Sequence, residues 1–102
     1  MKVTIQSIHF TAADRLKSYI QKKCDKLDQF FDRIIEGTVV LKVQQEVKNA
    51  NKHVEIKLMV PGDLLIAKEE AKTFEAAVDL ATDKLKLQLK KYKEKIRSRE
   101  AI

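Results

Sequence analysis

The sequence predicts a two-layer α/β sandwich of the α+β type, with elements in the order β-α-β-β-β-α. Four short stretches alternate apolar and polar residues, as strands do when one face of a sheet is buried. Two longer stretches repeat apolar residues every three or four positions, as amphipathic helices do. We therefore expect a four-stranded, mostly antiparallel sheet with two helices on one face. The chain of 102 residues is expected to form one domain, residues 1–102.

The first strand is expected at residues 2–10. Val3 and Ile5 alternate with polar residues, and the phase then slips before Ile8. An extra residue in a strand produces such a slip, so we expect a bulge near Ser7.

The first helix is expected from about Ala12 to Phe31. Thr11 and Asp14 have the spacing of a capping box at its start, and Gly37 is expected to close the connection after it. Its apolar stripe consists of Leu16, Tyr19, Ile20, Cys24, Leu27, Phe31 and Ile34.

Three further strands are expected in the middle of the chain. Residues 39–43 form the first of them, and residues 48–52 form a turn, because two Asn there tolerate left-handed backbone. Residues 53–60 alternate without a break, which sets the strand's register firmly. A turn at 61–63 then leads to a last strand at 64–69. With both helices on one face, the other face of the sheet is left as a possible contact surface.

The last helix, expected at residues 73–99, carries the basic excess of the chain. Between Lys84 and Arg99 there are six Lys and two Arg against one acid, whereas the other residues hold 13 basic and 14 acidic side chains. A helix of 27 residues spans about 40 Å at ~1.5 Å per residue, so its last two turns are expected to project past the sheet. One stripe seats the helix on the sheet: Phe74, Val78, Ala81, Leu85, Leu89, Tyr92 and Ile96. Along one flank lie Lys84, Lys91 and Lys95, and along the other lie Lys86, Lys90, Lys93 and Arg97.

No group of residues has the pattern of a catalytic or metal site. Cys24 falls in an apolar stripe and is expected to be a buried hydrophobe rather than a nucleophile. His9 and His53 have no Cys or carboxylate at ligand spacing, and two Gly, Gly37 and Gly62, do not make a phosphate loop. We therefore expect a binding protein with no enzymatic activity, cofactor, metal or small-molecule substrate.

The charge of the chain points to an anionic partner. The net charge is +6 and the isoelectric point is near 9.5, which fits a nucleic acid or an anionic membrane surface. A membrane is disfavoured because the apolar stripe of the last helix is needed by the sheet. Lys outnumbers Arg and aromatic residues are few, which favours contact with phosphates over base stacking. Without a signal peptide or membrane segment, a cytoplasmic location is expected. A second basic group lies on the first helix: Arg15, Lys17, Lys22, Lys23 and Lys26.

Several segments resemble one bacterial family. They are FFDRI at 30–34, VVLKV at 39–43, FEAAVDLATDKL at 74–85 and KKYKEK at 90–95. Nearly the whole chain resembles the short ribosome hibernation-promoting factors and the related ribosome-associated translation inhibitors. The resemblance implies a fold similar to double-stranded RNA-binding domains. It also implies binding to the small ribosomal subunit near the decoding centre, which excludes messenger and transfer RNA and represses translation under stress or in stationary phase.

The resemblance also implies particular RNA contacts. Lys84, Lys91, Lys93 and Lys95 match the cations of the second-helix motif, and Lys23 and Lys26 match those before FFDRI; each is expected to contact ribosomal RNA phosphates. With the flank cations, the predicted RNA-binding set is Lys23, Lys26, Lys84, Lys86, Lys90, Lys91, Lys93, Lys95 and Arg97.

One position departs from the family pattern. Leu87 stands on the exposed side where many members have Arg. The chain is expected to be of the short form, without the C-terminal dimerisation domain of long members, and monomeric when free. A stand-alone module for double-stranded RNA is the alternative function.

Overall fold

The computed structural model describes residues 1–44 and 51–100 and confirms the expected order of elements. Residues 48–50 of the expected turn lie outside the described residues. The elements are β1 (Lys2–Ile8), α1 (Asp14–Phe30), β2 (Glu36–Val43), β3 (Lys52–Val60), β4 (Asp63–Ala71) and α2 (Phe74–Glu100).

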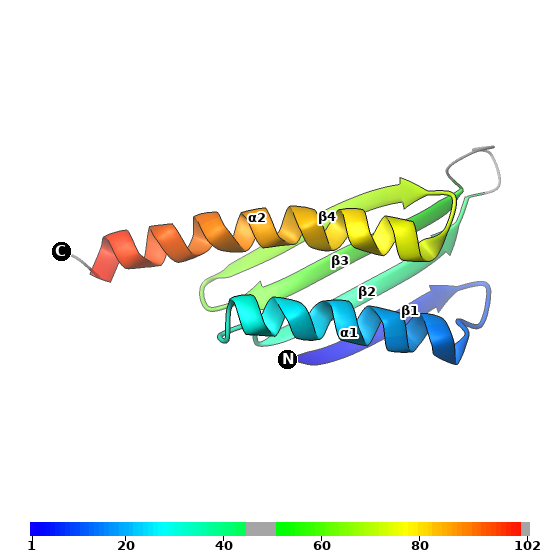
Figure 1. Cartoon of the computed structure of the whole chain (residues 1–102), viewed down its shortest axis with the longest axis horizontal. Helices are drawn as coiled ribbons and strands as arrows, with labels where there is room; N and C mark the ends of the chain where they lie inside the picture. The colour runs from blue at the N-terminus through cyan, green and yellow to red at the C-terminus, as the bar shows by residue number, and fades with distance from the viewer. Residues whose placement is uncertain (45–50, 101–102) are drawn as a thin grey trace.

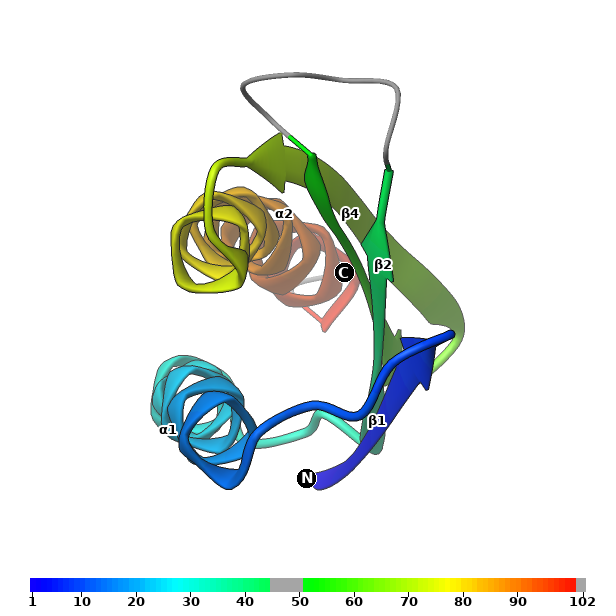
Figure 2. The same ribbon diagram turned by 90° about the vertical axis from the view of Figure 1, so that its right-hand side faces the viewer.

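The strands form one mixed sheet in the order β1-β2-β3-β4. β2, β3 and β4 pair antiparallel, whereas β1 pairs parallel to β2. The parallel pair arises because α1 carries the chain back along the sheet before β2 begins. Both helices cover the same face, as the end-on view in Figure 2 shows. The mostly antiparallel sheet with two helices on one face is thus confirmed.

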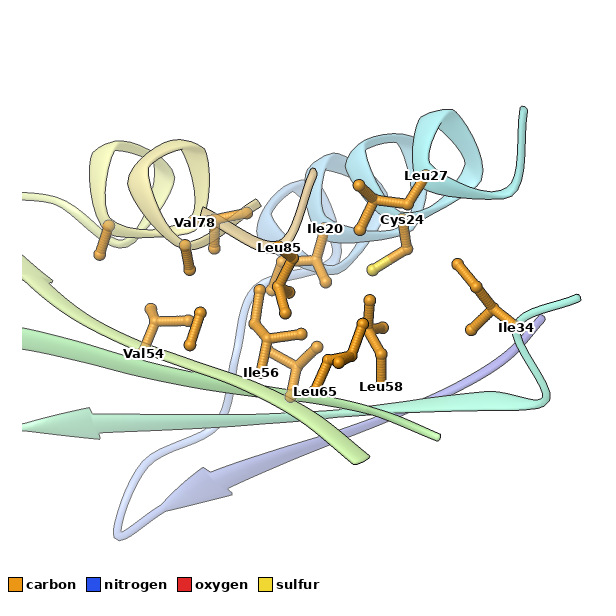
Figure 3. Packing of buried hydrophobic residues seen from close by; sticks show 14 of the residues in the cluster. Ile20, Cys24, Leu27, Ile34, Val54, Ile56, Leu58, Leu65, Val78 and Leu85 are labelled. Carbon is orange, nitrogen blue, oxygen red and sulfur yellow. The ribbon is translucent and has the colours of Figure 1, made fainter. Parts of the chain in front are cut away.

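The core lies between the helices and the inner face of the sheet (Figure 3). Val54, Ile56 and Leu58 of β3 are fully buried, as their alternation predicts. Leu85 and Leu89 of α2 are equally buried. Each fully buried Leu or Val contributes about 1.5–3 kcal/mol to folding relative to an exposed one, so these two stripes hold the layers together.

The bulge expected near Ser7 is wrong. β1 pairs with β2 without interruption from Lys2 opposite Glu36 to Ile8 opposite Lys42. The phase slips only after the strand, where His9 takes a φ of 64°. Ile8 therefore points to the outer face of the sheet and is 38% exposed.

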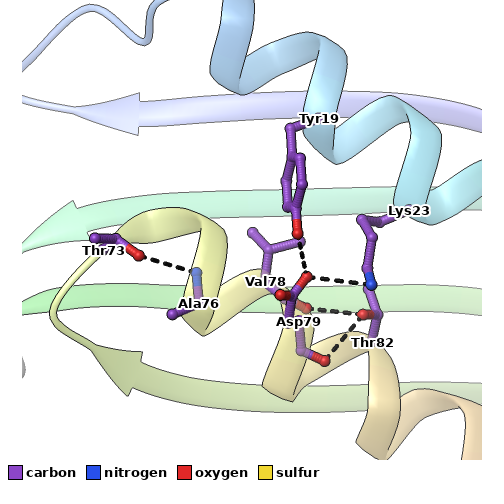
Figure 4. Close-up of polar contacts among 7 residues, drawn as sticks. All are labelled: Tyr19, Lys23, Thr73, Ala76, Val78, Asp79 and Thr82. Carbon is purple, nitrogen blue, oxygen red and sulfur yellow. Dashed lines mark hydrogen bonds and ion pairs between the residues drawn. The ribbon is translucent and has the colours of Figure 1, made fainter.

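The expected capping box at the start of α1 is also wrong. The helix begins at Asp14, its N-cap is Ala13, and no side chain caps it. At the start of α2, by contrast, the hydroxyl of Thr73 accepts a hydrogen bond of 3.1 Å from the backbone N–H of Ala76 (Figure 4).

Gly37 lies inside β2 rather than in the connection where we expected it. A Cβ at this position would lie 2.9 Å from the sulfur of Met1 and 3.3 Å from a methyl carbon of Leu58. Close packing therefore explains this glycine better than a turn does.

α2 extends past the sheet at its C-terminal end, as expected (Figure 1). The hydroxyl of Tyr92 donates a hydrogen bond to the carbonyl of Pro61, in the turn between β3 and β4. This contact ties the helix to the end of the sheet, and the turns that follow Tyr92 project beyond it.

The outer face of the sheet carries charged and polar side chains together with an apolar corner. Met59, Leu64 and Ile66 are 40–46% exposed at this corner, where the register places Met59 opposite Leu64 and Ile66 opposite Lys57. Neither α1 nor the described part of α2 has the length and hydrophobicity that a membrane-spanning helix needs.

Candidate nucleic-acid interface

α1 and α2 lie side by side on the sheet and run in the same direction (Figures 1 and 2). Near their N-terminal ends, the hydroxyl of Tyr19 donates to Asp79 at 2.5 Å. Near the C-terminal end of α1, the ammonium of Lys93 donates to the carbonyl of Phe30 at 3.1 Å. The two helices therefore stay in contact along most of α1, and the line where they meet is a surface groove.

This interhelical groove is a row of adjoining hollows of about 390, 480 and 430 Å³, each of which is lined in part by Phe30. Among the described residues that line it, seven cations face three carboxylates. The groove is thus strongly positive, which suits a polyanionic ligand. The cations are Lys23, Lys26, Arg33, Lys86, Lys90, Lys93 and Arg97, and the carboxylates are those of Asp32, Asp83 and Glu94.

Most of the predicted RNA-binding residues meet in this groove, and a smaller group does not. The groove contains Lys23, Lys26, Lys86, Lys90, Lys93 and Arg97. The other three, Lys84, Lys91 and Lys95, lie on the flank of α2 that faces away from α1. Lys84 is ion-paired there with Glu69 of β4, whereas Lys91 and Lys95 are exposed. We call the α2 members of the first group the groove flank of α2: Lys86, Lys90, Lys93 and Arg97. We call the second group its β4 flank: Lys84, Lys91 and Lys95.

Phe30 and Arg33 were missed by sequence reasoning about the site. Phe30 is half-buried in the groove, with the ammonium groups of Lys86 and Lys93 5.5 and 4.6 Å from its ring centroid. The FFDRI segment contains both residues, but the apolar stripe of α1 includes Phe31 and not Phe30. Helical periodicity therefore gave Phe30 no role.

The outermost line of α2 carries apolar and acidic side chains, although basic residues flank it on both sides. At 100° per residue, Leu80, Asp83, Leu87 and Glu94 point directly away from the sheet. Leu87 is 64% exposed and Leu80 is 46% exposed. Leu87 is therefore a solvent-facing leucine between two basic flanks.

A polar cluster joins the helices at the N-terminal end of the groove (Figure 4). Asp79 of α2 accepts the hydrogen bond from Tyr19 and pairs with Lys23 at 3.1 Å. The hydrogen bond from Tyr19, together with Lys23, lowers the pKa of Asp79, although partial burial opposes this. The same hydrogen bond raises the pKa of Tyr19. Lys23 is thus paired with a carboxylate of α2 at this end of the groove.

Cys24 is fully buried beneath α1. Burial raises the pKa of its thiol to about 11, and the neighbouring Asp25 and Asp28 act in the same direction. A thiol of that pKa is a poor nucleophile near neutral pH. Within residues 1–44 and 51–100, the structure contains no group of three His, Cys, Asp or Glu that is arranged to hold a metal ion.

Comparisons with known proteins agree with this fold. The chain is 35% identical to a ribosome hibernation promoting factor of Pseudomonas putida, over 96% of this chain and 92% of that protein. It is 33% identical to a ribosome hibernation promoting factor of Escherichia coli K12, over 95% and 98% of the two chains.

Solved structures show the same architecture. The N-terminal domain of Thermus thermophilus Protein Y superimposes with a TM-score of 0.78 and 28% identity, over 90% of this chain and 99% of that one. A ribosomal subunit interface protein of Coxiella burnetii superimposes with a TM-score of 0.82 at 24% identity, over 92% and 99%. Residues 3–97 match the profile of the family described as Sigma 54 modulation protein / S30EA ribosomal protein. This chain therefore belongs to the Sigma 54 modulation protein / S30EA ribosomal protein family.

Proposed function

We propose that this protein is a cytoplasmic ribosome hibernation factor that binds the small ribosomal subunit near the decoding centre. There it excludes messenger and transfer RNA and represses translation under stress or in stationary phase. The observation that carries the proposal is the convergence of cations from α1 and α2 in one groove. The names of its relatives, which are ribosome hibernation promoting factors, support the ribosome as the partner.

The chemistry of the groove suits RNA backbone better than exposed bases. Its cations are mostly Lys, which bind phosphates as flexible point charges. The ring of Phe30 is occupied by Lys86 and Lys93 rather than open for stacking. Recognition then depends on the shape of a folded RNA and on where its phosphates lie. Inhibition needs no catalysis, because a domain that fills the space of messenger and transfer RNA excludes both.

The test is cosedimentation of the purified protein with small ribosomal subunits over a salt series, followed by cell-free translation. We expect salt-dependent binding, with log K falling by roughly 0.7–0.9 per phosphate contacted for each tenfold rise in salt. We also expect inhibition of translation at the protein concentrations that saturate the subunits.

A matched control uses the other face of the molecule. Lys2, Lys42 and Lys68 are exposed on the outer face of the sheet. Changing all three to Glu removes the same net charge as a reversal in the groove, so binding should weaken only through the loss of long-range attraction and far less than when groove cations are changed. If the unchanged protein does not sediment with small subunits at low salt, the proposed function is wrong. Equal affinity for a plain RNA duplex and for the subunit would instead favour a general double-stranded RNA-binding module.

A further inference from the structure

Phe30 sits where the groove brings two lysines of α2 together. The ammonium of Lys93 lies 4.6 Å from the centroid of its ring and that of Lys86 lies 5.5 Å from it. Both distances are within the range of a cation–π interaction. Lys86 and Lys93 are seven positions apart, which is about 10 Å along a helix. They therefore reach the ring of Phe30 from two different turns of α2.

Lys93 is held by a second contact at the same place. Its ammonium donates to the carbonyl of Phe30, one of the last carbonyls of α1. The C-terminal end of a helix carries partial negative charge, and α1 has no basic residue of its own in its last turn. Lys93 therefore supplies from α2 the cation that the end of α1 lacks.

An aromatic ring orders a cation without cancelling its charge. Lys23 and Lys84 are also ordered in this molecule, but by carboxylates, those of Asp79 and Glu69. A carboxylate partner must be displaced or shared when a phosphate arrives, whereas the ring keeps the full positive charge available. Phe30 thus distinguishes Lys86 and Lys93 from the paired lysines elsewhere.

We propose that Phe30 is a positioning residue that holds Lys86 and Lys93 as a preformed site for phosphates of the RNA backbone. The inference rests on the proposed function, since it names the part of that interface that is ordered in advance. A free Lys side chain loses much of its rotamer freedom when it is immobilised, which opposes binding. Because the ring has already restricted two such side chains, binding a phosphate costs less than it would at a mobile lysine.

The test is a set of variants whose affinities for small ribosomal subunits are measured at several salt concentrations. Phe30→Leu removes the ring and keeps an apolar side chain, Phe30→Tyr keeps the ring, and Lys86→Met removes one cation. We expect Phe30→Leu to weaken binding about three- to tenfold, as the loss of a cation–π contact predicts, and Phe30→Tyr to stay within about twofold of the unchanged protein. In Phe30→Leu the salt dependence should be nearly unchanged, since every cation is still present.

The double variant separates positioning from simple packing. If Phe30 acts through the lysines, Phe30→Leu should weaken binding less in the Lys86→Met variant than in the unchanged protein. The reason is that Lys86→Met has already removed one of the two lysines that the ring positions. Full additivity, equal binding by Phe30→Leu and the unchanged protein, or equal loss in Phe30→Tyr and Phe30→Leu would each overturn the inference.

A measurement without RNA tests the positioning role of Phe30 separately from the proposed function. The ring current of Phe30 should shift the NMR signals of the Lys86 and Lys93 side-chain protons next to nitrogen, and Phe30→Leu should abolish these shifts. Circular dichroism at the assay temperature shows that each variant is folded. Failure of the unchanged protein to bind subunits would refute the proposed function, whereas absent ring-current shifts would refute the positioning role alone.

Discussion

The two flanks of α2 carry the same kind of charge in different surroundings. The groove flank faces α1, whose Lys26 adds a cation to it, and Phe30 lies between its cations. The β4 flank faces the edge of the sheet, where Glu69 pairs with Lys84. A polyanion can therefore meet several convergent cations on one flank but only separate ones on the other. The contrast shows that the two flanks differ in how their cations are arranged, and the proposed RNA interface rests on that arrangement.

The largest expected effect comes from reversing the charge of the groove flank. Changing Lys86, Lys90 and Arg97 to Glu lowers the net charge from +6 to zero. This set leaves Lys93 in place to cap α1. Three lost charge-assisted contacts of about 1.5–3 kcal/mol each should weaken binding to small subunits by roughly a thousandfold or more, as measured by cosedimentation.

The matched variant reverses the β4 flank by the same charge. Changing Lys84, Lys91 and Lys95 to Glu should weaken binding by roughly ten- to a hundredfold, mainly through the loss of long-range attraction. Both variants should keep their melting temperature within a few degrees, because the residues lie outside the buried stripe. Similar losses in the two variants would contradict the distinction between the flanks.

A gain is expected from Leu87, which lies on the outer line between the flanks. Leu87→Arg places a cation beside the groove at a side chain that is 64% exposed, so the core does not change. We expect a several-fold rise in affinity, and log K should fall more steeply with salt by about 0.9 for each added phosphate contact. Leu87→Gln, which adds polarity without charge, is the control. An unchanged salt dependence in Leu87→Arg would show that no phosphate lies near this position.

A smaller effect is expected when the β4 flank is released from its partner. Glu69→Gln removes the carboxylate beside Lys84 but keeps the size of the side chain. We expect binding to rise by less than about threefold. The free energy of unfolding should fall by no more than about 1 kcal/mol, as for a surface ion pair, and urea titration measures it. A rise in affinity as large as that of Leu87→Arg would mean that Lys84 is a main phosphate contact whose charge Glu69 offsets.

The smallest effect concerns the cluster around Asp79, at the end of the groove. Because the pKa of Asp79 is lower in the folded protein, its contribution to stability is complete above its ordinary pKa of about 4 and is lost as pH falls through the lower folded value. Asp79→Asn should therefore reduce the loss of stability on acidification between neutral pH and about pH 3, as measured by urea unfolding. The same acid dependence in both proteins would show that the ion pair has no net effect.

Local patterns predicted much of this molecule, and distant contacts explain where they failed. The alternation in β3 and the stripe of α2 predicted which residues are buried, because the spacing of apolar residues along one helix or strand sets which of its faces is buried. Alternation in the first strand wrongly predicted a bulge near Ser7. The phase of the pattern instead changes at His9, which has a positive φ and lies after the end of β1. Local pattern predicts a loop at Gly37, because the closeness of Met1 and Leu58 that explains this glycine comes from residues far away in the sequence.

The amino-acid pattern alone predicts the order of elements, the buried stripe of α2 and the division of its cations into two flanks. These follow from the fixed geometry of a helix or strand and need no knowledge of neighbours. The packing of whole elements, by contrast, sets which flank faces α1, brings Lys84 to Glu69, and places Phe30 between Lys86 and Lys93. Lys93 and Phe30 are 63 positions apart, and what lies opposite a side chain depends on how whole elements pack. The basic surface was therefore visible in the sequence, whereas the groove that organises it was not.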